Sequence, residues 1–178
     1  MNISWSHCVL KVRDLDAMVS FYCDMLGFKV ADRGTLGPEG PLIVFLSGSS
    51  RDHHQIAFVA TREPEGESSV DHNAFRVESV ADVQAMVGRV QADDRVKFNA
   101  PVTHGNAISV YFADPEGNGI EIFCDTPWHV VQPQMKGWDP TGSPKEILAS
   151  VEASFRDEPD FQPMETYQAE KAKEFGEG

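Results

Sequence analysis

Cysteines, basic residues and long apolar runs are all scarce in this sequence. Its 178 residues include three cysteines, an odd number without Cys-x-x-Cys spacing, which argues against a disulfide framework and against a structural zinc site. The 15 Lys and Arg against 28 Asp and Glu argue against a partner held through nucleic-acid phosphates or an anionic membrane. No apolar stretch approaches the roughly 18 residues of a membrane span. Because the amino terminus also lacks the pattern of a secretory leader, we expect a cytoplasmic chain.

The sequence contains one internal repeat. The segment HCVLKV begins at His7, and HNAFRV begins at His72, so both follow the order His, any residue, small apolar, large apolar, basic, Val. At the same distance after each histidine stands a residue that commonly caps a helix, Asp14 in the first copy and Ser79 in the second. The repeat predicts two halves with the same structure.

Each half continues with a helix and three strands. Apolar residues return every three or four positions from Asp14 to Gly27 and again after Ser79, which predicts one amphipathic helix in each half. Glycine, proline and serine clusters separate strand-like segments at 29–32, 42–46 and 55–60, then at 96–99, 108–112 and 119–124. Both halves therefore follow a β-α-β-β-β pattern. We predict an α+β domain over 1–124, with one module at about 4–62, a second at about 70–124, and a polar linker near 61–69.

The sequence changes character after residue 124. Residues 125–178 are rich in proline and acidic residues, and we interpret them as an extension rather than a third repeat. Ser143, Pro144 and Glu146 form a helix start with a capping box, which predicts one docked helix there. Beyond Arg156 the composition suits a tail that either wraps the domain or stays mobile. The aromatic residues near its start either line a site entrance or anchor the extension: Trp128, His129 and Trp138.

Two histidines and one glutamate are candidate metal ligands. His7 and His72 hold equivalent positions, so packing of the two halves about a pseudo-twofold axis would direct both toward a central cleft. Glu121 is a lone carboxylate within an apolar strand, where an unpaired charge is costly and a divalent cation would relieve the cost. Two imidazoles and one carboxylate suit ferrous iron with open coordination positions. The alternatives are structural histidines and a solvent-facing Glu121.

The second half carries a recognisable motif. Its constrained positions resemble the signature of type I extradiol ring-cleavage dioxygenases: Val102-Thr103-His104, Val110-Tyr111, Asp114-Pro115-Glu116-Gly117 and Glu121. The first half resembles the glyoxalase and bleomycin-resistance members of the same vicinal oxygen chelate superfamily, at His7, Phe21-Tyr22 and Leu26-Gly27-Phe28. The resemblance covers residues 5 to about 124 and leaves the extension out.

This resemblance implies paired βαβββ modules of the vicinal oxygen chelate fold around iron(II), or manganese(II), bound by His7, His72 and Glu121. It implies an extradiol dioxygenase that inserts both atoms of O2 into a catecholic substrate and cleaves the ring beside the diol. In that reaction His54 is the acid–base group, and His104 and Tyr111 donate hydrogen bonds to the catecholate and oxygen. Similar enzymes carry a second, non-catalytic domain that this sequence lacks. We therefore expect the extension, or the partner subunit of a homo-oligomer, to close the pocket.

Other activities of the same superfamily fit the sequence less well. A glyoxalase-type lyase or isomerase usually has a fourth protein ligand on the last strand of the first half, where this chain offers only the weak ligand Gln55. A fosfomycin-resistance-type transferase needs clustered Lys and Arg for a phosphonate, and basic residues are sparse in the second half. A metal-free drug-binding protein would not need His7, His72 and Glu121 together.

Overall fold

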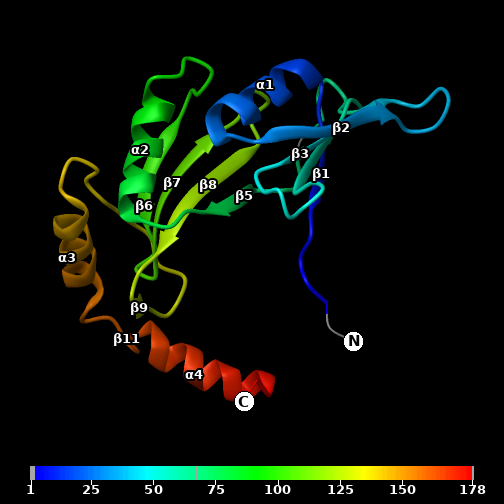
Figure 1. The fold of residues 1–178 in the computed structure, drawn as a ribbon. Helices are drawn as coiled ribbons and strands as arrows, with labels where there is room; N and C mark the ends of the chain where they lie inside the picture. The colour runs from blue at the N-terminus through cyan, green and yellow to red at the C-terminus, as the bar shows by residue number, and fades with distance from the viewer. Residues whose placement is uncertain (1–2, 67, 178) are drawn as a thin grey trace. The chain divides into compact units, whose positions relative to one another are not determined.

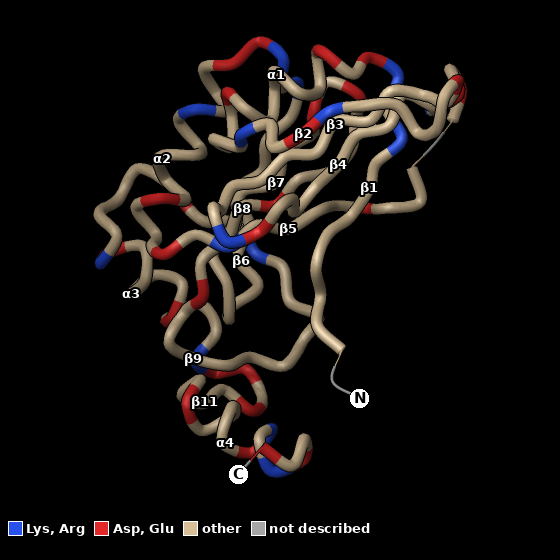
Figure 2. Tube along the Cα trace, turned by 45° about the vertical axis from the view of Figure 1, so that its right-hand side comes forward, with Lys and Arg blue, Asp and Glu red and all other residues tan. Residues whose placement is uncertain are grey.

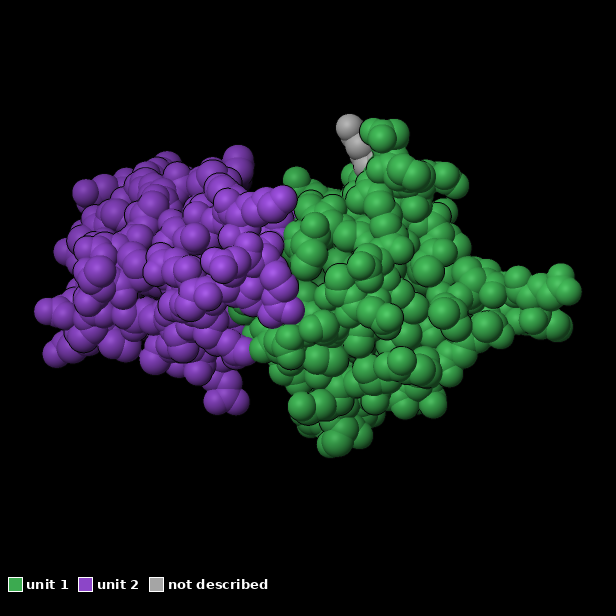
Figure 3. Space-filling model, turned by 90° about the horizontal axis from the view of Figure 1, so that it is seen from above, with its two compact units in different colours: residues 1–71, 114–118 green, residues 72–113, 119–178 purple. Residues whose placement is uncertain are grey.

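The computed structural model describes residues 3–66 and 68–177 and divides the chain into two compact units (Figures 1 and 3). Unit 1 comprises residues 1–71 and 114–118, and unit 2 comprises residues 72–113 and 119–178. No helix within this described part is long and apolar enough to cross a bilayer. Acidic positions predominate in both units, with basic positions scattered among them (Figure 2).

Unit 1 is a four-stranded sheet with one helix along it (Figure 1). The sheet has the order β1-β4-β3-β2, in which β1 runs parallel to β4 and the other pairs are antiparallel. The predicted helix is confirmed: the Asp14 side chain accepts from Ala17 N at its start, and Gly27 ends it with a φ of 74°. The bounds are β1 (Cys8–Lys11), α1 (Leu15–Leu26), β2 (Lys29–Thr35), β3 (Leu42–Ser47) and β4 (Ile56–Val59).

The turn formed by residues 114–118 belongs to the core of unit 1. Tyr22 is fully buried, and its ring packs edge-on against that of Phe58, with centroids 4.8 Å apart. Its hydroxyl donates a 3.2 Å hydrogen bond to the Asp114 carboxylate. Burial raises the pKa of the Asp114 carboxyl, although hydrogen bonds from its neighbours, led by Asn118, oppose the rise. The Glu116 carboxylate accepts from the backbone of Arg13 and Asp14, and so satisfies exposed amides ahead of α1.

Unit 2 repeats the same pattern with a five-stranded sheet of order β10-β6-β7-β8-β5. The Ser79 side chain caps the predicted helix by accepting from Asp82 N, and the helix packs on β6, β7 and β8. The two βαβββ modules predicted from the repeat are therefore present. The bounds are β5 (His72–Arg76), α2 (Val80–Gln91), β6 (Asn99–Thr103), β7 (Ala107–Ala113), β8 (Gly119–Asp125) and β10 (Lys136–Gly137).

One predicted strand is displaced along the chain. The expected strand at 96–99 lies at Asn99–Thr103, because β6 pairs with β7 from Asn99 opposite Phe112 to Thr103 opposite Ile108. The residues before it form a turn, in which Val96 N donates to Asp93 O and Arg95 bonds the Asp93 carboxylate. Register with β7, which is not a local property, sets where this strand begins.

The extension contains two helices rather than one. The helix predicted after Ser143 is present with both halves of its capping box, and it buries Ile147, Val151 and Phe155. A second helix follows it that the sequence pattern did not predict, and this helix has no buried residue. The ring of Tyr167 in this helix stacks on the ring of His129, with centroids 3.7 Å apart. The bounds are β9 (Trp128–His129), α3 (Pro144–Phe155), β11 (Gln162–Pro163) and α4 (Met164–Phe175), with β11 antiparallel to β9.

Candidate functional site

Unit 2 brings together four of the residues predicted from the sequence. Tyr111 on β7 lies directly opposite Glu121 on β8. His72, at the start of the adjoining strand β5, places its Nε2 3.4 Å from Glu121 Oε2. The edge of the His72 ring also meets Tyr111, with centroids 5.2 Å apart. His104, which follows β6, places its Nε2 2.9 Å from the Tyr111 hydroxyl. These four side chains form the unit 2 cluster: His72, His104, Tyr111 and Glu121.

The Glu121 carboxylate is buried, with 7% of the residue exposed, so the solvent-facing alternative is wrong. Its Oε1 accepts a 2.6 Å hydrogen bond from the hydroxyl of Ser109, and its Oε2 faces His72. His104 Nε2 stands 3.9 Å from Oε1. A buried carboxylate with few donors around it is costly, and both imidazoles and cations relieve that cost.

The protonation pattern of His104 follows from its neighbours. Its Nδ1 lies 2.6 Å from the backbone carbonyl of Gln134, and a carbonyl can only accept, so Nδ1 carries the hydrogen. In the neutral ring Nε2 is then the acceptor, and the Tyr111 hydroxyl donates to it. The carbonyl of Gln134 therefore fixes the direction of the His104–Tyr111 hydrogen bond.

Unit 1 brings together the other two predicted site residues. The rings of His7 and His54 have centroids 4.3 Å apart. His54 Nδ1 lies 2.9 Å from His53 Nδ1, and His53 Nε2 lies 2.9 Å from the Asp32 carboxylate. Asp32 can only accept, so while both rings are neutral His53 donates to Asp32 and accepts from His54 Nδ1. This arrangement leaves His54 Nε2 without a proton.

The pKa of His54 favours the same neutral form. Partial burial, followed by the neighbouring His7 and His53 rings, lowers the pKa of this imidazole from its usual value. Phe45 packs its ring edge against His54, with centroids 4.9 Å apart, and restricts its orientation. A neutral imidazole with a bare Nε2 has the properties of a general base near neutral pH.

The predicted ligand set is divided between the units. His7 belongs to unit 1, whereas His72 and Glu121 are neighbours in unit 2. Within residues 3–66 and 68–177, neither unit by itself gathers three His, Cys, Asp or Glu side chains in a metal-binding group. His72 and Glu121 in unit 2 do fit a metal. Two donor atoms that each lie about 2.1 Å from one ion are roughly 3 Å apart, and His72 Nε2 lies 3.4 Å from Glu121 Oε2. The three-ligand set stays a prediction.

Several residues around these clusters were not predicted. Ser109 could have been found from strand alternation, because it shares a face of β7 with Tyr111. Asp32 and His53 carried no such signal, since their pairing depends on how β2 lies against the loop after β3. Gln134 acts through its carbonyl, which every residue type has. Gln55, the weak ligand considered for a lyase, has a structural partner, because its side chain accepts from Gly48 N.

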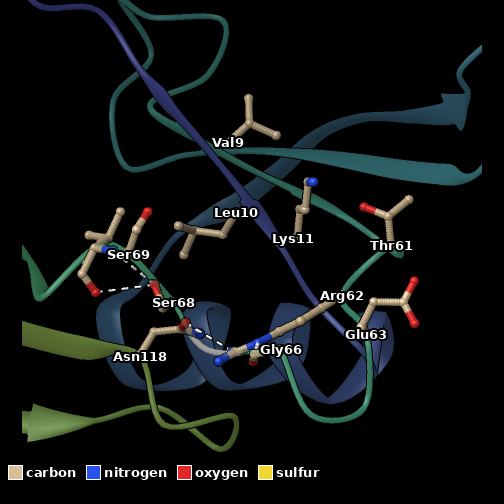
Figure 4. Close-up of a pocket in the computed structure, with 11 residues that line it drawn as sticks. Val9, Leu10, Lys11, Thr61, Arg62, Glu63, Gly66, Ser68, Ser69 and Asn118 are labelled. Carbon is tan, nitrogen blue, oxygen red and sulfur yellow. Dashed lines mark hydrogen bonds between the residues drawn. The ribbon is translucent and has the colours of Figure 1, made fainter.

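Unit 1 also contains a cavity of about 430 Å³ (Figure 4). None of its lining residues belongs to the predicted site; they include Val9, Lys11, Arg62, Glu63, Ser68 and Asn118. The Arg62 guanidinium, its best anion donor, already bonds Gly66 O, Glu116 O and the Asn118 side chain. The Arg62 guanidinium is therefore engaged within unit 1.

Comparison with known proteins places the fold in context. The family model described as "Glyoxalase/Bleomycin resistance protein/Dioxygenase superfamily" matches residues 4–122. An iron-dependent extradiol dioxygenase of Rhodococcus jostii is 31% identical over 130 residues, covering 67% of this chain and 42% of that protein. A probable lactoylglutathione lyase of Synechocystis is 25% identical, covering 65% of this chain and 91% of that protein.

Solved structures support the same fold. The fosfomycin resistance protein FosX of Listeria monocytogenes, in complex with Mn(II) and sulfate, aligns with a TM-score of 0.56 at 20% identity. The alignment covers 71% of this chain and 95% of that one. The chain spans only part of other curated relatives: 39% of the length of a metapyrocatechase of Pseudomonas and 62% of a biphenyl-2,3-diol 1,2-dioxygenase of Rhodococcus globerulus.

Proposed function

Because this chain belongs to the glyoxalase/bleomycin resistance protein/dioxygenase superfamily, we propose that it is an iron(II)-dependent extradiol dioxygenase acting on a catechol. The observation that carries the proposal is the unit 2 cluster, in which a buried Glu121 adjoins His72 while His104 and Tyr111 lie beside them. A relative named as an iron-dependent extradiol dioxygenase, together with relatives named as biphenyl-2,3-diol 1,2-dioxygenases, supports this activity over others in the superfamily.

The residues that would hold iron(II) are His7, His72 and Glu121, with manganese(II) as the alternative ion. When bound, such an ion supplies a redox-active centre with positions open to a catecholate and to dioxygen. Ser109 holds one oxygen of Glu121 in place by a 2.6 Å hydrogen bond, and this fixes the direction in which the other oxygen points. Burial of the carboxylate excludes the water that would compete for it.

His54 acts as the acid–base group in this proposal. A catechol must lose protons to chelate a metal, and His54 Nε2 is the unprotonated nitrogen that accepts one. Its lowered pKa keeps the ring neutral at the start of the reaction. The same nitrogen, once protonated, would return that proton to a substrate oxygen later in the reaction. Because the Tyr111 hydroxyl donates to His104 Nε2, its oxygen remains available in this proposal to accept a hydrogen bond from a substrate hydroxyl. Tyr111 would donate to a substrate oxygen only by releasing His104.

The proposal is tested by metal content and ring fission. Protein purified without oxygen and loaded with ferrous iron should retain about one iron per chain and convert a catechol in air to a yellow ring-fission product. His72→Ala and Glu121→Ala should lose both iron and turnover. Glu152→Ala is the matched control for the carboxylate, because Glu152 pairs with Arg156 on α3 and has no part in the proposed site. Iron retained by both ligand variants would show that the ligands are wrongly assigned.

A separate variant tests the acid–base group. His54→Ala should retain iron and lose about 10²- to 10⁴-fold in kcat, the usual contribution of a positioned general base. The rate is followed by oxygen uptake over a panel of catechols. An unchanged rate would make His54 a residue outside the reaction.

A glyoxalase-type lyase is the second candidate, favoured by one observation: the chain covers 91% of the probable lactoylglutathione lyase it matches. The residue that would supply a fourth ligand, Gln55, accepts from Gly48 N at 2.9 Å in unit 1. Turnover of the hemithioacetal of methylglyoxal and glutathione, with no oxygen uptake on any catechol, would favour this candidate. Absence of a tightly bound metal would favour a small-molecule binding protein.

A further inference from the structure

The segment that follows the family match encloses the turn carrying His104. The match ends at residue 122, and residues 126–138, here called the strap, lie beyond it. Gly105 accepts through its carbonyl from the Thr126 hydroxyl at 2.8 Å and from the Trp128 indole at 2.7 Å. The Gly105 backbone has a φ of 83°, and a Cβ placed there would stand 2.6 Å from Val130. The strap therefore packs closely on this turn.

Gln132 connects the strap to His104 itself. Its amide nitrogen donates to the His104 carbonyl at 2.8 Å and to the Val130 carbonyl at 3.1 Å. Its amide oxygen accepts from Gln134 N at 3.0 Å. One side chain thus fixes the distance between the His104 backbone and Gln134, whose own carbonyl accepts from the His104 ring.

The far end of the strap reaches the other side of the cluster. Its strand β10 pairs with β6, with Lys136 opposite Thr103. The indole of Trp138, which is 9% exposed, donates to the Ser109 carbonyl at 2.8 Å. Ser109 in turn donates to Glu121. The strap therefore contacts the residues that orient both the His104–Tyr111 pair and the predicted ligand Glu121.

We propose that the strap is a positioning element of the site, and that Gln132 is its key positioning residue. By holding the Gln134 carbonyl against His104 Nδ1, Gln132 fixes the His104 tautomer, so that Nε2 accepts from Tyr111. This inference rests on the proposed function for its catalytic consequence, whereas the tautomer is a property of the chain itself. Residues outside the superfamily match thus set the hydrogen-bond direction within it.

The first experiment reads the tautomer in the full-length protein before metal is added. Long-range ¹H–¹⁵N correlation spectra distinguish Nδ1–H from Nε2–H imidazoles, and His104→Gln identifies the His104 signals. We expect His104 to be the Nδ1–H tautomer in the unmodified protein. In Gln132→Ala it should shift toward a mixture or toward Nε2–H. A wild-type His104 with its hydrogen on Nε2 would overturn the proposal.

The matched control changes the same residue type two positions along the strap. Gln134→Ala keeps the backbone carbonyl that His104 uses, so its His104 signals should match the wild type. Gln132 is exposed, so its replacement removes hydrogen bonds without emptying a core position. Gln132→Met keeps the side-chain length and should shift the tautomer as Gln132→Ala does. Unchanged His104 signals in both Gln132 variants would refute the positioning role.

The second experiment measures the catalytic consequence in the iron-loaded protein. Gln132→Ala should lower kcat on a cleaved catechol about fivefold, the effect of one misdirected hydrogen bond, with little change in KM and in iron content. Gln91→Ala, at an exposed position at the end of α2, should leave all three unchanged. A shifted tautomer with an unaltered kcat would overturn the catalytic part. If no catechol is cleaved, the proposed function fails, while the spectra still decide whether the strap positions His104.

Discussion

The hydrogen bond from Ser109 to Glu121 gives the sharpest test of the cluster. Ser109 is fully buried on β7, and its hydroxyl donates to the carboxylate at 2.6 Å. Replacing Ser109 by Ala removes this donor, and the buried position gives water little access to replace it. His72 Nε2 lies 3.4 Å from the other carboxylate oxygen.

The expected cost follows from the charge of the acceptor. Hydrogen bonds to charged groups contribute about 1.5–3 kcal/mol, against about 1 kcal/mol for neutral pairs. Ser109→Ala should therefore lower the free energy of unfolding by about 2 kcal/mol in metal-free protein. Ser47→Ala is the matched control, because the Ser47 hydroxyl bonds the uncharged backbone of Ser49, and it should cost about 1 kcal/mol.

Urea denaturation of the single variants, together with Glu121→Gln and the double variant, measures the pair directly. The cycle should give a coupling of about 1–2 kcal/mol between Ser109 and Glu121. If Glu121 is a metal ligand, Ser109→Ala should also weaken iron binding about 10- to 100-fold. A coupling near zero, with Ser109→Ala no more costly than Ser47→Ala, would refute the described geometry of Glu121.

Three further predictions concern the body of the protein. Burial raises the pKa of the Cys124 thiol to about 11, so peptide mapping after iodoacetamide at pH 8 should find it largely unlabelled, and rapid labelling would contradict its burial. Phe155→Ala should lower the free energy of unfolding by about 3–5 kcal/mol because the ring is fully buried, whereas the exposed Phe175→Ala should change it by less than about 0.5 kcal/mol. Gly105→Ala, at positive φ in a packed turn, should lower the free energy of unfolding by more than about 1 kcal/mol. Gly88→Ala, within α2 and facing open space, should raise it by about 0.5–1 kcal/mol. Equal shifts of the melting temperature in the two variants would contradict both expectations.

The local elements of this protein were determined by the sequence alone. The starts of three helices follow from Asp14, Ser79 and Ser143, because a capping side chain bonds an amide only two or three residues away. The duplicated βαβββ order follows from the repeat that begins at His7 and His72. Short-range chemistry repeated in the same order was sufficient to predict the fold.

Strand register could not be obtained in this way. The sixth strand begins at Asn99 rather than at residue 96, because pairing with β7 decides which residues are extended. The second helix of the extension, α4, has no buried residue, so no apolar stripe in the sequence predicts it. Both features depend on contacts with distant residues.

The candidate site shows the same division. Residue types at equivalent repeat positions indicated His7, His72 and Glu121, yet only the sheet register brings Glu121 opposite Tyr111 and beside His72. The bond that orients His104 comes from the carbonyl of Gln134, 30 positions along the chain, and a backbone carbonyl leaves no signature in a sequence. Side-chain chemistry can be predicted from residue identity, whereas the direction of each hydrogen bond is decided by which distant backbone atoms the tertiary fold brings within reach.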